Sequence, residues 1–91
     1  MFRYKPSIHV SYDQQGYIYF VSRLYKQLPD REREKIRLLC RETGGPDSGT
    51  LLEYVTAGAS AEAVCMKHYI SRSTLRRAER RYYEGFSRRI S

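Results

Sequence analysis

The chain has 91 residues, and its 17 Lys and Arg against 10 Asp and Glu give it a net charge of +7. This length is typical of one domain and is too short for a catalytic cleft between two domains. We expect a cytoplasmic protein without a membrane partner, because no apolar run approaches the roughly 20 residues of a bilayer span and the N-terminus has no apolar core of a secretory signal.

The first part of the chain allows two interpretations. Ile8, Val10 and Tyr12 alternate with polar residues, which favours a strand, and residues 13–16 could close a hairpin onto residues 17–21. A hairpin over residues 7–21 is therefore one alternative.

The second interpretation is an N-terminal arm over residues 1–15 followed by a helix over about residues 16–27. Four apolar residues recur on one helical stripe, and Pro29 supplies a stop. The stripe consists of Tyr17, Val21, Leu24 and Leu28. We favour the arm and helix because the stripe is longer than a typical strand, and we assign residues 16–91 to a single helical domain.

Two helices are predicted in the middle of the chain. The first begins at Asp30, whose side chain is suited to cap the free backbone amides, and it ends at residues 44–46, Gly-Gly-Pro. The second covers about residues 48–57 and is closed by Gly58. Their expected buried residues are Ile36, Leu39, Cys40, Leu51, Leu52 and Val55.

Two further helices are expected near the C-terminus. Ser60 would cap a helix over residues 61–68, and Ser71 would cap a long helix that runs from Arg72 towards Arg88. In this last helix one apolar seam is formed by Leu75, Ala78, Tyr82 and Phe86. The basic side chains that project away from the seam are Arg72, Arg76, Arg77 and Arg80. The elements together predict an all-α domain of four or five helices.

Positive charge is concentrated in the last quarter of the chain. Residues 71–91 hold seven Arg and two Glu, a net charge of +5, whereas residues 1–70 carry +2. The planar guanidinium of arginine suits phosphates and guanine edges. This distribution indicates a polyanionic partner, most often nucleic acid.

No pattern in the sequence points to catalysis or to a metal. Cys40 and Cys65 form no Cys-x-x-Cys pair and are interpreted as reduced core residues. His9 and His68 are far apart, and no base motif accompanies the hydroxyls of residues 71–74. We therefore expect no enzyme activity, no cofactor and no metal.

Residues 60–82 have the spacing of a helix-turn-helix. Val64 and Cys65 supply the apolar and the small residue of its first helix, and Ile70 would fill the core after the turn. The sequence Ile-Ser-Arg-Ser-Thr-Leu-Arg-Arg at residues 70–77 resembles the turn and recognition helix of bacterial sigma-factor region four. It is also similar to small phage and mobile-element regulators that use this unit.

The resemblance covers residues 28–86, because residues 28–34 are similar to the opening of the same region. Two positions depart from it. The family usually has Gly, or another residue tolerant of a positive φ angle, where this chain has Tyr69, and Leu where it has His68. The resemblance implies that the helix beginning at Arg72 enters the major groove of double-stranded DNA.

The expected contacts with DNA divide into two groups. Bases would be contacted by Arg72, Arg76 and Arg77, and phosphates by Ser71, Ser73, Thr74 and Arg80. Non-specific attraction would come from Arg81, Arg88 and Arg89. Tyr83 is the freer of two neighbouring tyrosines to stack on an unpaired base, although duplex DNA is favoured over single strands or RNA.

The sequence therefore predicts a sequence-specific duplex DNA-binding protein, a transcriptional regulator of phage or mobile-element type. Activator, repressor and recombination accessory are equally compatible with it. The alternative is a protein-interaction module that acts on RNA polymerase or on a DNA-processing complex without reading bases. A homodimer is also expected, because one helix-turn-helix makes few contacts and the arm over residues 7–12 has no obvious partner within a helical chain.

Overall fold

Five α-helices make up most of the computed structural model, which describes residues 2–90. They are α1 (Tyr12–Arg23), α2 (Asp30–Gly44), α3 (Ser48–Ala57), α4 (Ala61–His68) and α5 (Arg72–Ile90), with short 3-10 turns η1 (Tyr25–Gln27) and η2 (Gly45–Asp47). No strand occurs in this part of the chain, so the predicted all-α domain is confirmed and the hairpin alternative is wrong. None of the helices within residues 2–90 is both long and apolar enough to cross a bilayer.

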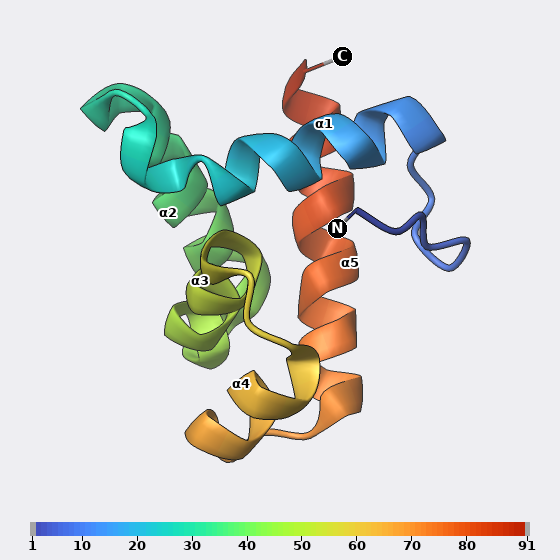
Figure 1. Cartoon of the computed structure of the whole chain (residues 1–91), viewed down its shortest axis with the longest axis vertical. Coiled ribbons are helices and arrows are strands. Elements are labelled where there is room, and N and C mark those ends of the chain that lie inside the picture. The colour runs from blue at the N-terminus through green and yellow to red at the C-terminus, as the bar shows by residue number, and fades with distance from the viewer. Residues whose placement is uncertain (1, 91) are drawn as a thin grey trace.

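Helix α5 runs through the middle of the molecule (Figure 1). Helix α4 packs against its beginning, α1 crosses near its other end, and α2 and α3 cover one side. The N-terminal arm lies on the side opposite α2 and α3. This arrangement leaves the first turns of α5 at one end of the molecule, next to α4.

Local sequence signals set most helix ends. The Oγ of Ser60 accepts a hydrogen bond from the backbone N of Ala63 at 3.1 Å, and Gly58 ends α3 with a φ angle of +75°. The predicted cap at Asp30 is wrong. Pro29 occupies the cap position without a side-chain hydrogen bond, and Asp30 instead forms an ion pair with Arg33.

Helix α1 begins and ends four residues earlier than predicted. The signal that fixes its start is Ser11, whose Oγ accepts a hydrogen bond from the backbone N of Gln14 at 3.2 Å. The predicted apolar stripe extends beyond the true end of α1. The reason is that residues 25–27 form η1, and Tyr25 and Leu28 still pack against the core there. The continuous stripe therefore placed the helix too far along the chain.

The arm is part of the core. Ile8 and Val10 are both buried in the main hydrophobic cluster. The Nε2 of Gln15 donates hydrogen bonds to the carbonyl oxygens of Lys5, Ile8 and Val10, and its Oε1 accepts one from the backbone N of Lys5 at 3.0 Å. The expectation that residues 7–12 lack a partner within the chain is wrong, because Gln15 donates to the carbonyl oxygens of Ile8 and Val10 and Glu84 accepts a hydrogen bond from the backbone N of His9.

Two hydrophobic clusters hold the helices together. The larger consists of Ile8, Val10, Ile18, Ile36, Leu39, Cys40, Leu51, Val55, Ala78, Tyr82 and Tyr83. The smaller joins α4 to the start of α5 and consists of Val64, Cys65 and Leu75. Both cysteines are buried free thiols, as predicted.

Candidate nucleic-acid interface

A three-residue turn, residues 69–71, joins α4 to α5. The backbone N–H groups of Tyr69 and Ile70 both donate to the carbonyl oxygen of Cys65, which closes the end of α4. Tyr69 adopts the left-handed conformation with φ +56° and ψ +45°, and its side chain is 94% exposed. The turn therefore has the positive φ angle expected at this position, although a tyrosine occupies it.

The apolar seam of α5 fixes which side of the helix faces outward. Leu75 is 2% exposed and packs with Val64 and Cys65 of α4, and Ala78 and Tyr82 are buried in the larger cluster. The seam is as predicted, with Phe86 partly buried at its end. Because these residues hold one side of α5 against the domain, the opposite side is left to solvent.

Four arginines occupy the exposed side of the first half of α5: Arg72, Arg76, Arg77 and Arg80. None of them forms an ion pair or a hydrogen bond with another residue in the range 2–90. Several cations elsewhere on the surface are paired with carboxylates, as in Lys67 with Glu53 at 3.2 Å. The start of α5 is thus a patch of unneutralised positive charge, which we call the arginine face.

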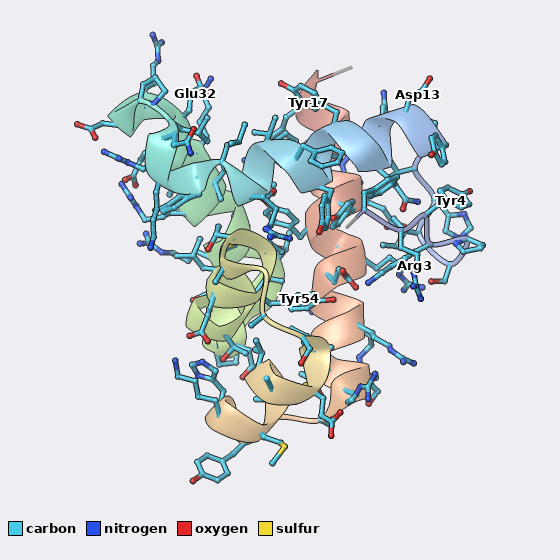
Figure 2. All side chains as sticks on the ribbon, in the orientation of Figure 1. Arg3, Tyr4, Asp13, Tyr17, Glu32 and Tyr54 are labelled. Carbon is cyan, nitrogen blue, oxygen red and sulfur yellow. The ribbon has the colours of Figure 1, made fainter. Side chains whose placement is uncertain are left out.

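One carboxylate in this stretch is removed from the arginine face by folding. Glu79 is 6% exposed, and both of its oxygens accept hydrogen bonds from the Nζ of Lys5, at 2.8 and 2.9 Å. Tyr54, which reaches from α3 towards α5, also accepts a hydrogen bond from this Nζ, at 3.4 Å (Figure 2). The ion pair neutralises Glu79, so Glu79 does not offset the exposed arginines beside it.

The hydroxyl residues of the predicted site lie together at the start of α5. The Oγ of Ser71 accepts a hydrogen bond from the backbone N of Thr74 at 3.1 Å and donates one to Thr74 Oγ1 at 2.8 Å. Ser73 is exposed, and its Oγ lies 3.2 Å from that of Ser71. Ser71 therefore caps the helix as predicted, and Ser73 is exposed beside it.

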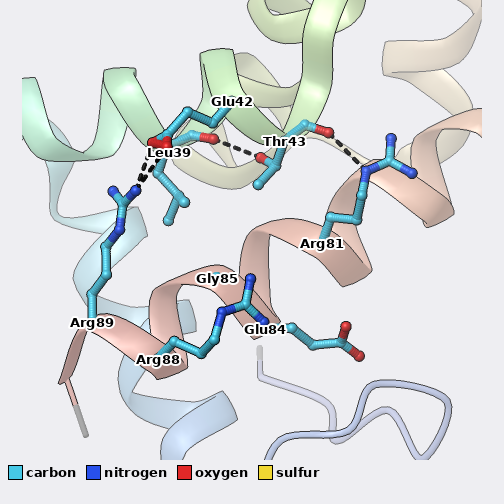
Figure 3. Close-up of a pocket in the computed structure, with 8 residues that line it drawn as sticks. All are labelled: Leu39, Glu42, Thr43, Arg81, Glu84, Gly85, Arg88 and Arg89. Atoms are coloured by element: carbon cyan, nitrogen blue, oxygen red, sulfur yellow. Dashed lines mark hydrogen bonds and ion pairs between the residues drawn. The ribbon is translucent and has the colours of Figure 1, made fainter.

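The remaining arginines of α5 face a different part of the molecule. Arg81 turns towards α2, where its Nε donates a hydrogen bond to the carbonyl oxygen of Thr43 at 3.0 Å (Figure 3). Arg89 forms an ion pair with Glu42 at 2.6 Å. With Arg88 they line a groove of about 360 Å³ between α2 and the C-terminal half of α5. The structure thus separates Arg81 from the other predicted site residues.

A second groove contains basic residues that sequence reasoning did not associate with α5. Arg3 and Lys5 of the arm and Arg23 of α1 line a volume of about 600 Å³ that reaches the α3–α4 connection. Arg23 donates a hydrogen bond to the hydroxyl of Tyr19 at 2.6 Å and has no carboxylate partner within residues 2–90. No local pattern could have revealed this groove, because its residues are far apart in the sequence.

Tyr83 is not available for stacking on a base. It is buried in the larger cluster, and burial raises its pKa above the ordinary tyrosine value. The Tyr83 ring lies on the buried side of α5, where it contacts the Tyr82 ring edge-on with ring centroids 5.9 Å apart. Tyr82 is fully buried, as predicted for a residue of the seam, but the expectation that Tyr83 is free to stack on a base is wrong.

Two further titratable groups have shifted pKa values, Cys40 and Glu53. Burial raises the pKa of the Cys40 thiol to about 12, which leaves it protonated and unreactive near neutral pH. The Nε2 of His68 lies 3.1 Å from Oε1 of Glu53. Hydrogen bonds, chiefly with His68 and also with Lys67, lower the pKa of the Glu53 carboxyl. Within residues 2–90, no three His, Cys, Asp or Glu side chains are grouped so that they could hold a metal ion.

Comparisons with protein-family models, with curated proteins and with solved structures give no match for this chain.

Proposed function

We propose that the chain is a sequence-specific duplex DNA-binding protein that inserts the first half of α5 into the major groove. The observation that carries this proposal is the arginine face: four exposed arginines without an ion-pair partner in the described chain, next to the turn from α4. Burial of Glu79 against Lys5 leaves this surface without a free carboxylate among residues 72–81. A uniformly positive helix surface favours binding to a phosphate backbone.

Specific contacts would come from the arginines nearest to the start of the helix. Arg72 and Arg76 are one helical turn apart, and Arg77 follows directly. A guanidinium can donate two hydrogen bonds to one guanine in the major groove. Ser73, with its exposed hydroxyl, and Arg80 are placed to contact phosphates.

In this proposal the function is that of a transcriptional regulator of the phage or mobile-element type, located in the cytoplasm. The rival function is a protein-interaction module that acts on RNA polymerase or on a DNA-processing complex. Its support is the pair of exposed apolar side chains, Met66 and Tyr69, beside the arginine face. We favour DNA because this surface carries four positive charges and only two exposed apolar side chains, and a concentration of positive charge favours a polyanionic partner.

The test is a binding selection from random duplexes, followed by titration of the selected and a scrambled duplex at two salt concentrations. A DNA reader retains a selected sequence, binds it more tightly than the scrambled duplex, and loses affinity steeply as salt rises. Failure to select any sequence, together with weak and equal binding of both duplexes, would favour the protein-interaction module.

A further inference from the structure

The outer side of α1 carries large apolar side chains that remain exposed to solvent. These side chains are each about half exposed: Tyr4, Tyr12, Tyr17, Phe20 and Leu24. We call this surface the outer aromatic face. Phe20, for example, is 57% exposed although it lies in the middle of a well-formed helix.

Helix α1 already buries its other side in the core of its own chain. Ile18 is fully buried, Gln15 holds the arm, and Ser22 contacts the hydroxyl of Tyr82 at 2.7 Å. A helix at the surface of a monomer normally presents polar residues to solvent, and one that is apolar on both sides is normally covered on both. The outer side of α1 therefore has the character of an interface.

Ring contacts join Tyr4, Tyr12 and Phe20 of the outer aromatic face, whereas the Tyr17 ring contacts Phe86 of α5 at 6.4 Å. Phe2 packs on α1 with ring centroids 5.6 Å from Tyr12 and 6.3 Å from Phe20, and Tyr4 lies 5.8 Å from Tyr12. The Phe2 ring lies over Gly16, where a Cβ would be 3.6 Å from the ring, an ordinary van der Waals distance. Contiguous exposed apolar patches of this kind mark interaction sites more often than scattered apolar residues do.

The charges at the two ends of the face are complementary to each other. Asp13 lies at the N-terminal end of α1 and Lys26 lies just beyond its C-terminal end, and neither has an ion-pair partner in the described part of the chain. If two copies of α1 pack antiparallel about an axis between Tyr17 and Phe20, Asp13 of each copy comes close to Lys26 of the other. A two-fold interface requires such a self-complementary surface.

The size of the face is sufficient for a weak dimer. A buried aromatic side chain covers 150–250 Å², so five large side chains that are half exposed offer about 500 Å² per copy and about 1,000 Å² in total. This is at the lower limit of specific interfaces, which corresponds to a dimer that exchanges with monomer.

We infer that the outer aromatic face binds the same face of a second copy of this chain, with the two α1 helices antiparallel. Tyr17 and Asp13 lie on the side of α1 that points away from α3 and α4 (Figure 2). The α4–α5 turn lies at the other end of the molecule (Figure 1). The dimer thus leaves the arginine face of each copy open, at its two remote ends. This inference concerns α1 alone and does not depend on DNA binding.

Sedimentation equilibrium over a concentration series of the full chain tests the inference. We expect a reversible dimer, and we expect Phe20→Glu to raise the dissociation constant by about 100-fold or more, because it places a charge in the centre of the apolar contact. Met66→Glu is the matched control: Met66 is also apolar and is 71% exposed but lies on α4, so the dissociation constant should stay unchanged. Circular dichroism verifies that each variant remains helical.

A charge exchange distinguishes antiparallel self-pairing from any other contact. Asp13→Lys and Lys26→Asp should each weaken the dimer by about tenfold or less, and the double variant should recover most of the loss. A wild-type chain that remains monomeric at about 0.5 mM would overturn the inference, and so would a dimer that Phe20→Glu leaves intact. Losses that simply add in the double variant would overturn the antiparallel arrangement.

Discussion

The Nζ of Lys5 lies 2.8 Å from Oε2 and 2.9 Å from Oε1 of Glu79, a residue 74 positions further along the chain. This ion pair links the N-terminal arm to the middle of α5, next to the arginine face. Burial disfavours the Lys5 ammonium, but hydrogen bonding and attraction to Glu79 outweigh burial and raise the pKa of Lys5. The arm therefore neutralises one carboxylate of α5 and also contributes Ile8 and Val10 to the core.

Replacement of Lys5 should therefore destabilise the fold. Lys5→Ala leaves the buried carboxylate of Glu79 without its partner, and we expect the free energy of unfolding to fall by about 1–3 kcal/mol. Urea denaturation measures the change. Lys26→Ala, which removes an exposed lysine without an ion pair, is the control and should change stability little. Equal stabilities of the two variants would contradict a structural role for the ion pair.

Tyr69 should be replaceable by glycine with a gain in stability. Its left-handed conformation costs a residue with a Cβ about 1–2 kcal/mol, and glycine avoids most of this cost. Because the Tyr69 side chain is 94% exposed, little packing is lost. We expect Tyr69→Gly to raise the free energy of unfolding by about 1 kcal/mol, whereas Tyr69→Ala should not. A decrease for Tyr69→Gly in thermal or urea denaturation would show that the tyrosine side chain stabilises the turn.

The contact between α4 and α5 depends on Leu75. Leu75→Asp buries a carboxylate without a partner in a cluster of only three buried residues, so it should detach α4 or unfold the domain. Ser73→Asp introduces the same charge two residues earlier at an exposed position of the first helical turn, where it should be tolerated. Circular dichroism and hydrogen exchange of the α4 amides compare the two. A Leu75→Asp variant that melts like the wild type would show that the seam is not packed.

Two arginine variants separate base reading from general attraction. Arg76→Ala should weaken binding to a selected duplex far more than to a scrambled one, since a bidentate contact with guanine contributes about 1–3 kcal/mol of discrimination. Arg88→Ala, more than three turns further along α5, should weaken both about equally and reduce the salt slope by at most about one. Competition binding at two salt concentrations measures both. Equal losses for Arg76→Ala on the two duplexes would identify α5 as an electrostatic anchor only.

Alkaline pH should unfold the protein through its buried phenols and thiol. Burial raises the pKa of Tyr82 well above the ordinary value and that of Cys40 from 9.0 to about 12. These groups remain protonated in the folded chain but ionise in the unfolded one, so their stabilising contribution is complete below about pH 9 and declines above it. Each group lowers the free energy of unfolding by about 1.4 kcal/mol per pH unit between its two pKa values. Urea titrations from pH 8 to about pH 11 should show this fall, and Cys40→Ala should make it less steep.

The sequence by itself determined the helices whose ends are set locally. Ser60, Ser71 and Gly58 act through hydrogen bonds or φ angles within a few residues, so their effect is present before any tertiary contact forms. The apolar seam of α5 and the exposure of its first four arginines followed from helical periodicity alone. Ser11 was an equally local signal, and a longer apolar stripe that continued into η1 obscured it.

Only the tertiary structure decided which of the remaining side chains reach solvent. Alternation at Ile8 and Val10 indicated a strand, but it reflects burial of an irregular arm whose carbonyl oxygens at these two positions accept hydrogen bonds from Gln15. Glu79 lay among arginines in the sequence, and its neutralisation depends on Lys5, at the other end of the chain. Such contacts depend on how distant segments pack, and periodicity describes one segment at a time. A local pattern therefore fixes the side of a helix on which a residue lies, and the packing of the other elements decides whether that side is covered.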